Sequence, residues 1–256
     1  MEQHGDDHII RIRGLGKKFG PHTVLDSLDL DIVRGETLVI IGRSGCGKSV
    51  LLKLITGLVK PDAGEIMFEG EDMTGFARKK LFEMRMRFGM LFQGSALFDS
   101  LSVGENVALP LRKHSKMTDE EICRTACEKL ELVGLTDVYD QFPAEMSGGM
   151  KKRIGLARAV VMDPNVVLYD EPTTGLDPIM ADVINELIRA LQRELEITSV
   201  VVTHDIKSAY HVGDRIAMLH EGRIIYSGTP DEVRRTDNPV LRQFVEGKAE
   251  GPIKPI

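Results

Sequence analysis

The chain has 256 residues, which is enough to bury a full core as one domain with subdomains or as two small domains. Its 33 basic and 39 acidic residues give a net charge of −6, which argues against a surface built to bind nucleic acid. No apolar run approaches the roughly 18 residues of a membrane helix, and no signal peptide is visible at the N-terminus. We therefore expect any membrane span to be supplied by another chain.

The three cysteines, an odd number, argue against a disulfide framework and favour a reducing cytosol. Cys123 and Cys127 are four apart on a predicted helix, a spacing that also suits a metal pair. No second pair completes a tetrahedral site, so we interpret them as small apolar residues of a helix face.

The N-terminal segment is predicted to form a small antiparallel sheet. Residues 8–35 alternate apolar and polar side chains, which is typical of strands with one face in solvent. Phe19 lies between two of these strands, where an aromatic side chain usually trims the core. It is also placed to stack on a base if a neighbouring loop holds the phosphates of that nucleotide. A turn at 61–64 leads into a further strand, 65–68, of the same sheet.

A glycine-rich loop follows the buried strand 37–41 and opens a helix. It matches the phosphate-binding pattern G-x-x-x-x-G-K-[ST], in which glycines let successive backbone N–H groups turn inward around an anion. Lys48 is expected to reach the β- and γ-phosphates, and the Ser49 hydroxyl to bind Mg²⁺. The alternative, a flexible turn, does not account for the flanking strand and helix. The residues expected to contact the nucleotide are Gly42, Arg43, Ser44, Gly45, Cys46, Gly47, Lys48, Ser49 and Val50.

The middle of the chain is predicted to be largely helical. Residues 76–87 are interpreted as an amphipathic helix or its approach to a strand rather than a nucleic-acid patch, because apolar side chains interleave with the basic ones. Thr118 begins a capping box, and the apolar spacing after it ends at Gly134. Because this region contributes no predicted core strand, we expect an inserted helical subdomain at about 95–160.

Four polar residues come at the carboxyl ends of predicted buried strands, where open α/β sheets bind ligands. Gln93 is a candidate for Mg²⁺ or the attacking water, although an amide there is often only a turn residue. Paired acids such as Asp170 and Glu171 after a strand are often only polar loop residues, but in a phosphate-loop protein an acid there completes the coordination of Mg²⁺ through its bound waters. Its neighbour then orients or deprotonates the attacking water. A lone histidine such as His204 is more often inert, but a fourth polar group at such an edge favours a role in the site.

Ser147, Gly148 and Gly149 open another helix and form a second anion-binding N-terminus. Since one nucleotide needs one phosphate loop, we expect this second site to serve a nucleotide held by another copy of the chain. Further along, Asp177 and Pro178 are predicted to be the N-cap and first residue of the next helix.

The C-terminal part is predicted to contain a hairpin at 215–226, turned at Glu221 and Gly222, and a last helix capped by Thr229. The tail, 246–256, is rich in glycine and proline and is expected to be extended. Its apolar residues lead to the hypothesis that it packs on another copy of the chain, with an unbound tail as the alternative.

These motifs, in this order, resemble the nucleotide-binding subunit of ABC transporters over nearly the whole chain. The resemblance implies an α/β fold with a P-loop NTPase (RecA-like) core, a small antiparallel β subdomain and an inserted α-helical subdomain over residues 8–245, followed by the tail. It also implies roles for single residues. Phe19 stacks on adenine, Lys48 and Ser49 belong to Walker A, Gln93 is the Q-loop residue, Ser147 to Met150 are the signature, Asp170 and Glu171 are Walker B and the catalytic base, Asp177 is in the D-loop, and His204 is the switch histidine.

Two departures from the family pattern bear on these roles. The stacking aromatic is phenylalanine rather than the commoner tyrosine, which costs little for stacking. The signature has Met146 in place of leucine and Met150 in place of glutamine. The Ser-Gly-Gly-Met ending, the stretch 92–98 and the tail with Gly-Pro-Ile resemble the ATPases of Mla and Mce lipid transporters.

The resemblance implies hydrolysis of ATP by two copies that face each other head to tail around two ATP molecules with Mg²⁺. The implied catalytic residues are Glu171, His204, Gln93 and Lys48, and the implied metal ligands are Ser49, Gln93 and Asp170. The implied partners are a second copy, membrane permease subunits, an MCE-type lipid-binding subunit and a small STAS-type accessory subunit. The implied place is the cytoplasmic face of the inner membrane, and the implied cargo is phospholipid or another lipid.

Other classes of protein share parts of this pattern. A soluble ABC ATPase of DNA repair carries a long coiled coil within the ATPase, whereas only modest helical sequence separates Gln93 from Ser147. Translation members usually join two such domains in one chain. An ABC importer ATPase for a small polar solute is a further alternative. A GTPase would carry an Asn-Lys-x-Asp motif, which does not follow the core here.

Overall fold

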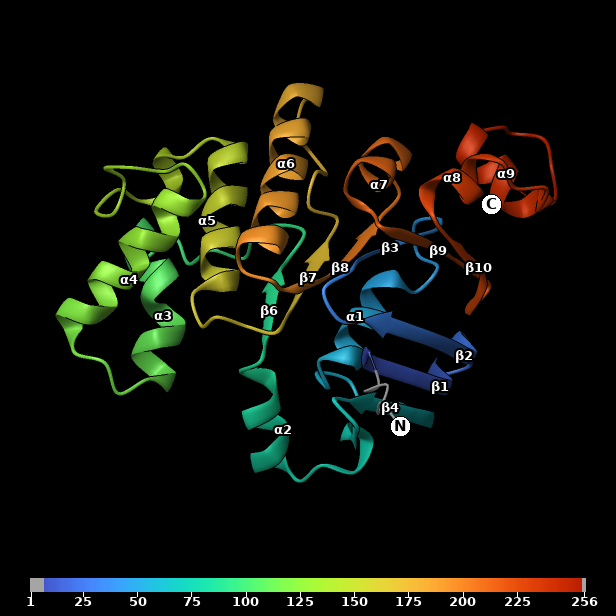
Figure 1. Cartoon of the computed structure of the whole chain (residues 1–256), viewed down its shortest axis with the longest axis horizontal. Coiled ribbons are helices and arrows are strands. Elements are labelled where there is room, and N and C mark those ends of the chain that lie inside the picture. Colours follow the sequence, from blue (N-terminus) through green and yellow to red (C-terminus); the bar gives the residue numbers. More distant parts are fainter. Residues whose placement is uncertain (1–6, 255–256) are drawn as a thin grey trace, which may run out of the picture. The chain divides into compact units, whose positions relative to one another are not determined.

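The computed structural model describes residues 7–254 of the chain (Figure 1). The fold divides into two compact units. The first consists of residues up to 81 together with those from 200 onward, and the second of residues 82–199. The boundaries expected for an inserted helical subdomain, 95–160, differ from those of the second unit and stay a prediction. The N-terminal residues 1–6, where no signal peptide was expected, lie outside the described residues.

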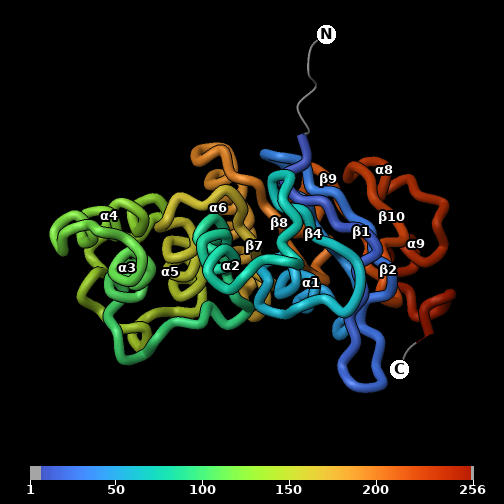
Figure 2. Tube along the Cα trace, turned by 90° about the horizontal axis from the view of Figure 1, so that it is seen from below, coloured from blue at the N-terminus to red at the C-terminus, as the bar shows by residue number. Residues whose placement is uncertain are grey.

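The first unit contains the expected small antiparallel sheet, with strand order β2-β1-β4-β5. Ile10 pairs with Ile32 and Ile12 with Leu30, and all four side chains are buried. Alternate residues of each strand therefore face the core, as the sequence pattern predicts. Figure 2 shows the β1–β2 hairpin as a blue loop that projects from this sheet. The strands are β1 (His8–Phe19), β2 (His22–Val33), β4 (Ala63–Phe68) and β5 (Glu71–Asp72), and a 3-10 turn follows at Met73–Gly75.

Parallel pairing in the first unit joins β3 (Thr37–Ile41) to β9 (Arg215–His220). All five residues of β3 are buried, which is typical of a parallel strand covered on both faces. Strand β10 (Arg223–Gly228) pairs antiparallel with β9 through the predicted turn, in which Glu221 and Gly222 both have positive φ. The helices of this unit before its C-terminal part are α1 (Lys48–Ile55) and α7 (Ile206–Val212).

The second unit packs two parallel strands against helices. Strand β6 (Phe88–Leu91) pairs with β7 (Val166–Asp170) as expected. A Cβ atom on Gly89 would lie 2.1 Å from the carbonyl oxygen of Ala159, so only glycine allows the helix to approach the strand this closely. The helices of this unit are α3 (Val103–His114), α4 (Asp119–Leu132), α5 (Gly148–Val160) and α6 (Pro178–Glu194), with a 3-10 turn at Pro143–Glu145. Helix α2 (Arg78–Arg85) and strand β8 (Thr198–Thr203) run across the boundaries of the units.

The structure confirms the helix boundaries that capping residues predict. Thr118 begins α4 with a capping box, and Gly134 follows the end of that helix with positive φ. The Asp177 carboxylate caps α6, and Pro178 stands at its first position. Among the described residues, no helix combines the length and the apolar character that crossing a membrane requires.

The C-terminal helices differ from the prediction. Thr229 caps α8 (Pro230–Arg234) as expected, but this helix is not the last one. A further helix, α9 (Pro239–Glu246), follows and is capped by Asn238. Its signal in the sequence is Asn238 followed by proline, the same arrangement of a capping side chain before a proline as Asp177 and Pro178 at the start of α6.

The tail is not extended over its described residues; it folds back onto α9. The Gln243 amide, 7% exposed, closes this fold: its Nε2 donates to the carbonyl oxygens of Lys248 at 3.1 Å and Ile253 at 2.9 Å. Its Oε1 accepts from the backbone N–H of Ile253 at 2.7 Å. Arg43 Nη1 donates to the carbonyl oxygen of Lys254 at 3.0 Å, which ties the tail to the glycine-rich loop. Packing of the tail on another copy stays a prediction, and residues 255–256 lie outside the described part.

Replacing Gln243 by alanine is expected to release the tail. The variant loses both the donor and the acceptor that close the fold, and each lost hydrogen bond costs about 1 kcal/mol, with more where a buried group is left unpaired. Trypsin should therefore cleave after Lys248 about tenfold faster than in the wild type, since about 1.4 kcal/mol corresponds to tenfold. Arg242→Ala, on the exposed face of the same helix, is the control. Equal cleavage of Gln243→Ala and the wild type would show that this amide does not hold the tail.

Candidate nucleotide-binding site

The glycine-rich loop leads into α1, whose N-terminus has no side-chain cap. Every α-helix from α3 to α9 instead begins at a serine, threonine, aspartate or asparagine that accepts a hydrogen bond from the first turn. The residue before α1 is Gly47, with a φ of 107°, and a Cβ atom there would lie 2.9 Å from Val24 Cγ1. No capping side chain therefore occupies the N-terminus of α1, and helix N-termini of this kind favour anions.

Lys48 lies inside this loop. Its Nζ is 2.8 Å from the carbonyl oxygen of Gly42 and 3.1 Å from that of Arg43, and the side chain is only 6% exposed. These two contacts place a positive charge where the helix N-terminus already favours an anion. The remaining predicted loop residues fall into two groups: Ser44 and Gly45 are exposed, and Cys46, Ser49 and Val50 are half-buried.

The loop fits the phosphates of a nucleotide on three observations: glycines at positions where a side chain would clash, an uncapped helix start and a buried ammonium group. Gly42 shows the first of these, since a Cβ atom there would lie 2.5 Å from the carbonyl oxygen of Leu219. Phosphate binding at helix N-termini uses the same groups. The ammonium and the helix start together can bind a triphosphate.

Two further predicted residues belong to the first unit. Phe19 is the last residue of β1 rather than part of a turn, and its ring is 48% exposed with Lys17 Nζ 5.3 Å from the ring centroid. His204 comes directly after β8 and is exposed. The next residue, Asp205, caps α7 by accepting from the N–H of Lys207. Both predicted side chains are thus accessible to a ligand, and their roles stay predictions.

The second unit holds the candidate acids. Asp170 is the last residue of β7 and Glu171 follows it, and each is 8% exposed. Glu171 has a φ of 50°, in the left-handed region that non-glycine residues seldom occupy. Thr174 Oγ1 donates to Glu171 Oε2 at 3.2 Å. Gln93, two residues after β6, is exposed. Backbone strain of this kind gathers at functional sites, which agrees with the predicted role of Glu171 as general base, and that role stays a prediction.

The residues expected to serve a second copy are also in this unit. Ser147 begins α5, and its Oγ accepts from the N–H of Met150 at 3.3 Å. Ser147 and Gly148 are exposed, whereas Gly149 is buried, and a Cβ atom on Gly149 would lie 2.4 Å from Met180 Cε. Asp177 accepts from the first turn of α6, so its carboxylate already has a structural role as a cap.

Sequence reasoning overlooked one buried cation. Lys152 in α5 is 5% exposed, and its Nζ donates to the carbonyl oxygens of Gln93 at 2.5 Å and Glu171 at 3.3 Å. Burial lowers the pKa of the Lys152 ammonium, and the negative charges of Asp170 and Glu171 partly oppose that shift. The available signal was helical spacing, because Lys152 follows the buried Gly149 by three positions and shares its side of the helix.

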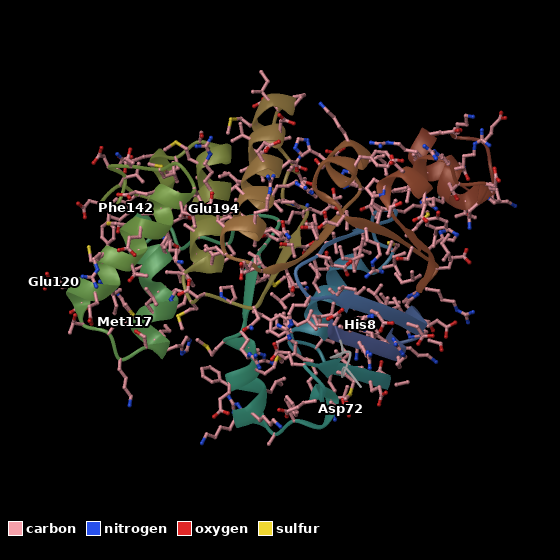
Figure 3. The ribbon with its side chains drawn as sticks, in the orientation of Figure 1. His8, Asp72, Met117, Glu120, Phe142 and Glu194 are labelled. Atoms are coloured by element: carbon pink, nitrogen blue, oxygen red, sulfur yellow. The ribbon has the colours of Figure 1, made fainter. Side chains whose placement is uncertain are left out.

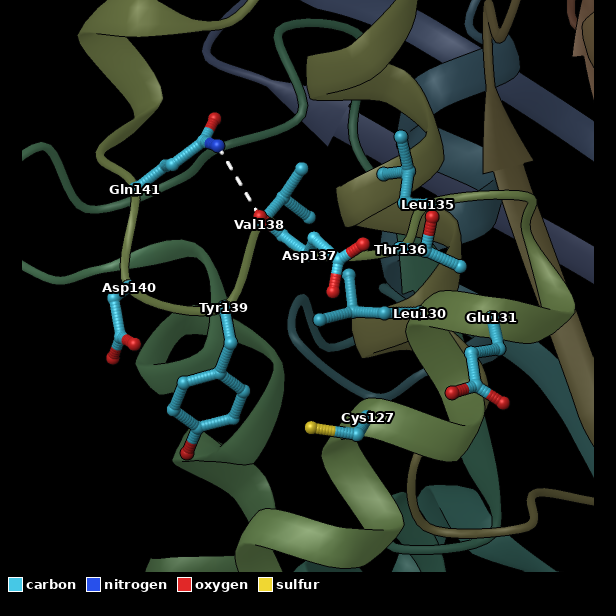
Figure 4. Close-up of a pocket in the computed structure, with 10 residues that line it drawn as sticks. All are labelled: Cys127, Leu130, Glu131, Leu135, Thr136, Asp137, Val138, Tyr139, Asp140 and Gln141. Atoms are coloured by element: carbon cyan, nitrogen blue, oxygen red, sulfur yellow. Dashed lines mark hydrogen bonds between the residues drawn. The ribbon is translucent and has the colours of Figure 1, made fainter.

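A hollow of about 670 Å³ lies at the end of α4 and the segment after it, and none of the predicted site residues lines it (Figure 4). Within it Gln141 Nε2 donates to the carbonyl oxygen of Asp137 at 3.3 Å. The next residue in the chain after Gln141 is Phe142, whose side chain is exposed and is labelled in Figure 3. The lining residues are Cys127, Leu130, Glu131, Leu135, Thr136, Asp137, Val138, Tyr139, Asp140 and Gln141.

Comparison with known proteins identifies relatives along nearly the whole chain. The chain is 38% identical over 249 residues to the intermembrane phospholipid transport system ATP-binding protein MlaF of Haemophilus influenzae, covering 97% of this chain and 94% of that protein. It is 43% identical over 244 residues to a Mycobacterium leprae protein named "Probable ribonucleotide transport ATP-binding protein mkl", covering 95% of this chain and 70% of that protein.

Solved structures agree with these relatives. The fold matches cbiO1 from Clostridium perfringens, part of the ABC transporter complex cbiONQ, with a TM-score of 0.83 and 32% identity over 93% of this chain and 94% of that one. It matches a dimeric ATP-binding cassette bound to ADP and Pi in a post-hydrolysis state with a TM-score of 0.79 and 33% identity over 86% and 98%. Residues 25–174 match the ABC transporter family. With its phosphate loop, its α/β P-loop NTPase fold and these relatives, the chain belongs to the ABC transporter family and is one of its ATPases.

Proposed function

We propose that this chain is the ATP-hydrolysing subunit of a transporter that moves phospholipid or another lipid between membranes. The observation that carries the proposal is the match to MlaF proteins along both chains, with 97% and 94% covered for the Haemophilus influenzae protein and 96% and 91% for the Escherichia coli protein. The mycobacterial relative has the higher identity, but the match covers only 70% of it. Ribonucleotide transport, which the name of that relative carries, is the second candidate.

In the proposed reaction the N–H groups at the start of α1 and the Lys48 ammonium bind the phosphates of ATP. The buried position of Lys48 strengthens this contact, because a charge-assisted hydrogen bond gains in a low dielectric. Ser49, Gln93 and Asp170 would hold Mg²⁺, since their oxygen atoms are the donors that this ion prefers. When bound, the ion supplies neutralising charge to the phosphate oxygens. Phe19 offers its exposed ring to the adenine.

Glu171 is the proposed general base of hydrolysis. Its carboxylate accepts a proton from the attacking water, and the hydrogen bond from Thr174 Oγ1 fixes the direction in which it points. Gln93 and His204, both with exposed side chains, are proposed to sense the γ-phosphate. Most of the rate enhancement then comes from positioning and charge rather than from covalent chemistry.

The proposed assembly is a homodimer around two ATP molecules. Ser147, Gly148, Gly149, Met150 and Asp177 would serve the nucleotide held by the other copy, and the exposed start of α5 is the surface that supports this. The proposed partners are membrane permease subunits, an MCE-type lipid-binding subunit and a STAS-type accessory subunit, and nucleic acid is not among them. The proposed place is the cytoplasmic face of the inner membrane, as a peripheral subunit.

The test is transport by the complex that co-purifies with this chain from detergent-solubilised membranes. The complex is reconstituted into proteoliposomes and supplied with ATP and either a fluorescent phospholipid or a radiolabelled ribonucleotide. ATP-dependent movement of phospholipid, absent in the Glu171→Gln complex, supports the proposal. ATP-dependent uptake of ribonucleotide without movement of lipid would overturn it in favour of the second candidate.

A further inference from the structure

Two cationic side chains of α5 are turned toward backbone carbonyl groups of the second unit. Lys152 is buried, and its Nζ contacts the carbonyl oxygens of Gln93 at 2.5 Å and Glu171 at 3.3 Å. Arg158, six residues further along the helix, donates to the carbonyl oxygens of Ser95 at 2.5 Å and Ala96 at 2.8 Å. The helix that begins at the signature serine therefore holds the segment after β6 at three carbonyl groups.

The segments held in this way have backbone conformations that need support. Ser95 has a φ of 60° and Ala96 a φ of 46°, and Glu171 has a φ of 50°. Such conformations are costly for residues with a Cβ atom and persist only where the surroundings maintain them. The contacts of Lys152 and Arg158 supply that support in two places. One is the segment after β6, which carries the proposed sensor Gln93, and the other is the end of β7, where the proposed base Glu171 follows the strand.

Lys152 differs from Arg158 because it reaches both segments. Gln93 and Glu171 are 59 and 19 residues from it along the chain, yet one ammonium group contacts the carbonyl oxygens of both. An ammonium group has three donors, so it can bind two carbonyl oxygens from different segments at once. A displacement of either segment changes the bond that the other one accepts.

We infer that Lys152 is a positioning residue that couples the backbone of the segment after β6, at Gln93, to the backbone at Glu171. The position of Glu171, the proposed base, then depends on the conformation of the segment that carries Gln93. This inference rests on the proposed role of Glu171 in ATP hydrolysis and deepens it by naming how the site is regulated. The side chain acts through the carbonyl groups of Gln93 and Glu171, to which its ammonium group donates.

The test compares Lys152→Met with Lys152→Arg, in the full chain within its co-purified membrane complex. Methionine fills the volume of the lysine stem but removes the ammonium donor from both carbonyl groups, whereas arginine retains donors. Lys152→Met should lower kcat for ATP by about 100-fold, the size expected when a reacting group is misplaced by about 1 Å. Its affinity for a non-hydrolysable ATP analogue should stay within about twofold of the wild type, because the substitution leaves Lys48 and the rest of the phosphate loop unchanged. Lys152→Arg should recover most of the rate.

Hydrogen exchange separates coupling from a general loss of packing. In Lys152→Met, exchange should rise in both peptides, 92–97 and 170–176, and not elsewhere in the second unit. Arg158→Met should raise exchange in 92–97 alone, because the contacts of that arginine end at Ser95 and Ala96. Lys151→Met, the neighbouring half-buried lysine, should change neither peptide and keep the wild-type kcat.

The inference is overturned if Lys152→Met keeps the kcat of Lys151→Met, or if exchange rises in only one of the two peptides. It is also overturned if Lys152→Met unfolds at a lower temperature with an equal loss of nucleotide affinity and Lys152→Arg does not recover the rate. The readouts are hydrolysis and exchange, so they do not depend on the cargo. A wild-type complex that hydrolyses ATP without moving lipid would contradict the proposed function and leave the result for Lys152 standing.

Discussion

Replacing Glu171 by glutamine is expected to abolish ATP turnover while ATP binding is retained. The substitution keeps the size of the side chain and its hydrogen bond from Thr174, but the amide cannot accept the proton of the attacking water. Loss of a general base lowers rates by about 10²- to 10⁴-fold. Because hydrolysis would no longer separate the two copies, we expect size-exclusion chromatography with ATP and Mg²⁺ to show a lasting dimer.

Glu194→Gln is the control for this variant, because it makes the same chemical change at an exposed position at the end of α6. It should hydrolyse ATP at the wild-type rate and form no lasting dimer. A Glu171→Gln protein that stays monomeric with ATP and still hydrolyses it would show that Glu171 is not the base.

Replacing Lys48 by alanine is expected to weaken the binding of ATP rather than to slow the hydrolysis of ATP that is already bound. The substitution removes the buried ammonium group of the phosphate loop, and a hydrogen bond to a charged group contributes about 1.5–3 kcal/mol to binding. Affinity for a labelled ATP analogue should therefore fall by about 10- to 100-fold, since about 1.4 kcal/mol corresponds to tenfold. The measurement is a fluorescence titration, with thermal melting of the same samples to confirm folding.

Lys53→Ala tests whether the loss is specific to the loop. Lys53 is on the same helix but exposed, so its removal should leave the affinity unchanged. If the Lys48→Ala protein bound the analogue as tightly as Lys53→Ala, with both folded, Lys48 would not be the phosphate-binding lysine. The variants of Glu171 and Lys48 also differ from each other, because only the first should retain nucleotide.

Sequence alone determined the features whose physical cause is local. The phosphate loop is a run of eight residues in which the glycines, the lysine and the helix start act on one another directly, so the pattern predicts its geometry. The starts of α4 and α6 follow from single capping residues, Thr118 and Asp177, and the buried strand β3 follows from five consecutive apolar or small residues. The start of α9 had an equally local signal in Asn238 and was overlooked.

Only the tertiary structure decided where distant segments meet. Lys152 could be placed on a helix face from its spacing, but its two carbonyl partners lie 59 and 19 residues away, and no local pattern specifies a contact between a side chain and a backbone carbonyl. The tail was expected to be extended because glycine and proline disfavour regular structure. It instead folds back, and the buried Gln243 amide satisfies its donors and its acceptor with carbonyl and N–H groups of the tail. Burial makes such polar partners obligatory, and burial is a property of the folded chain rather than of any short stretch of sequence.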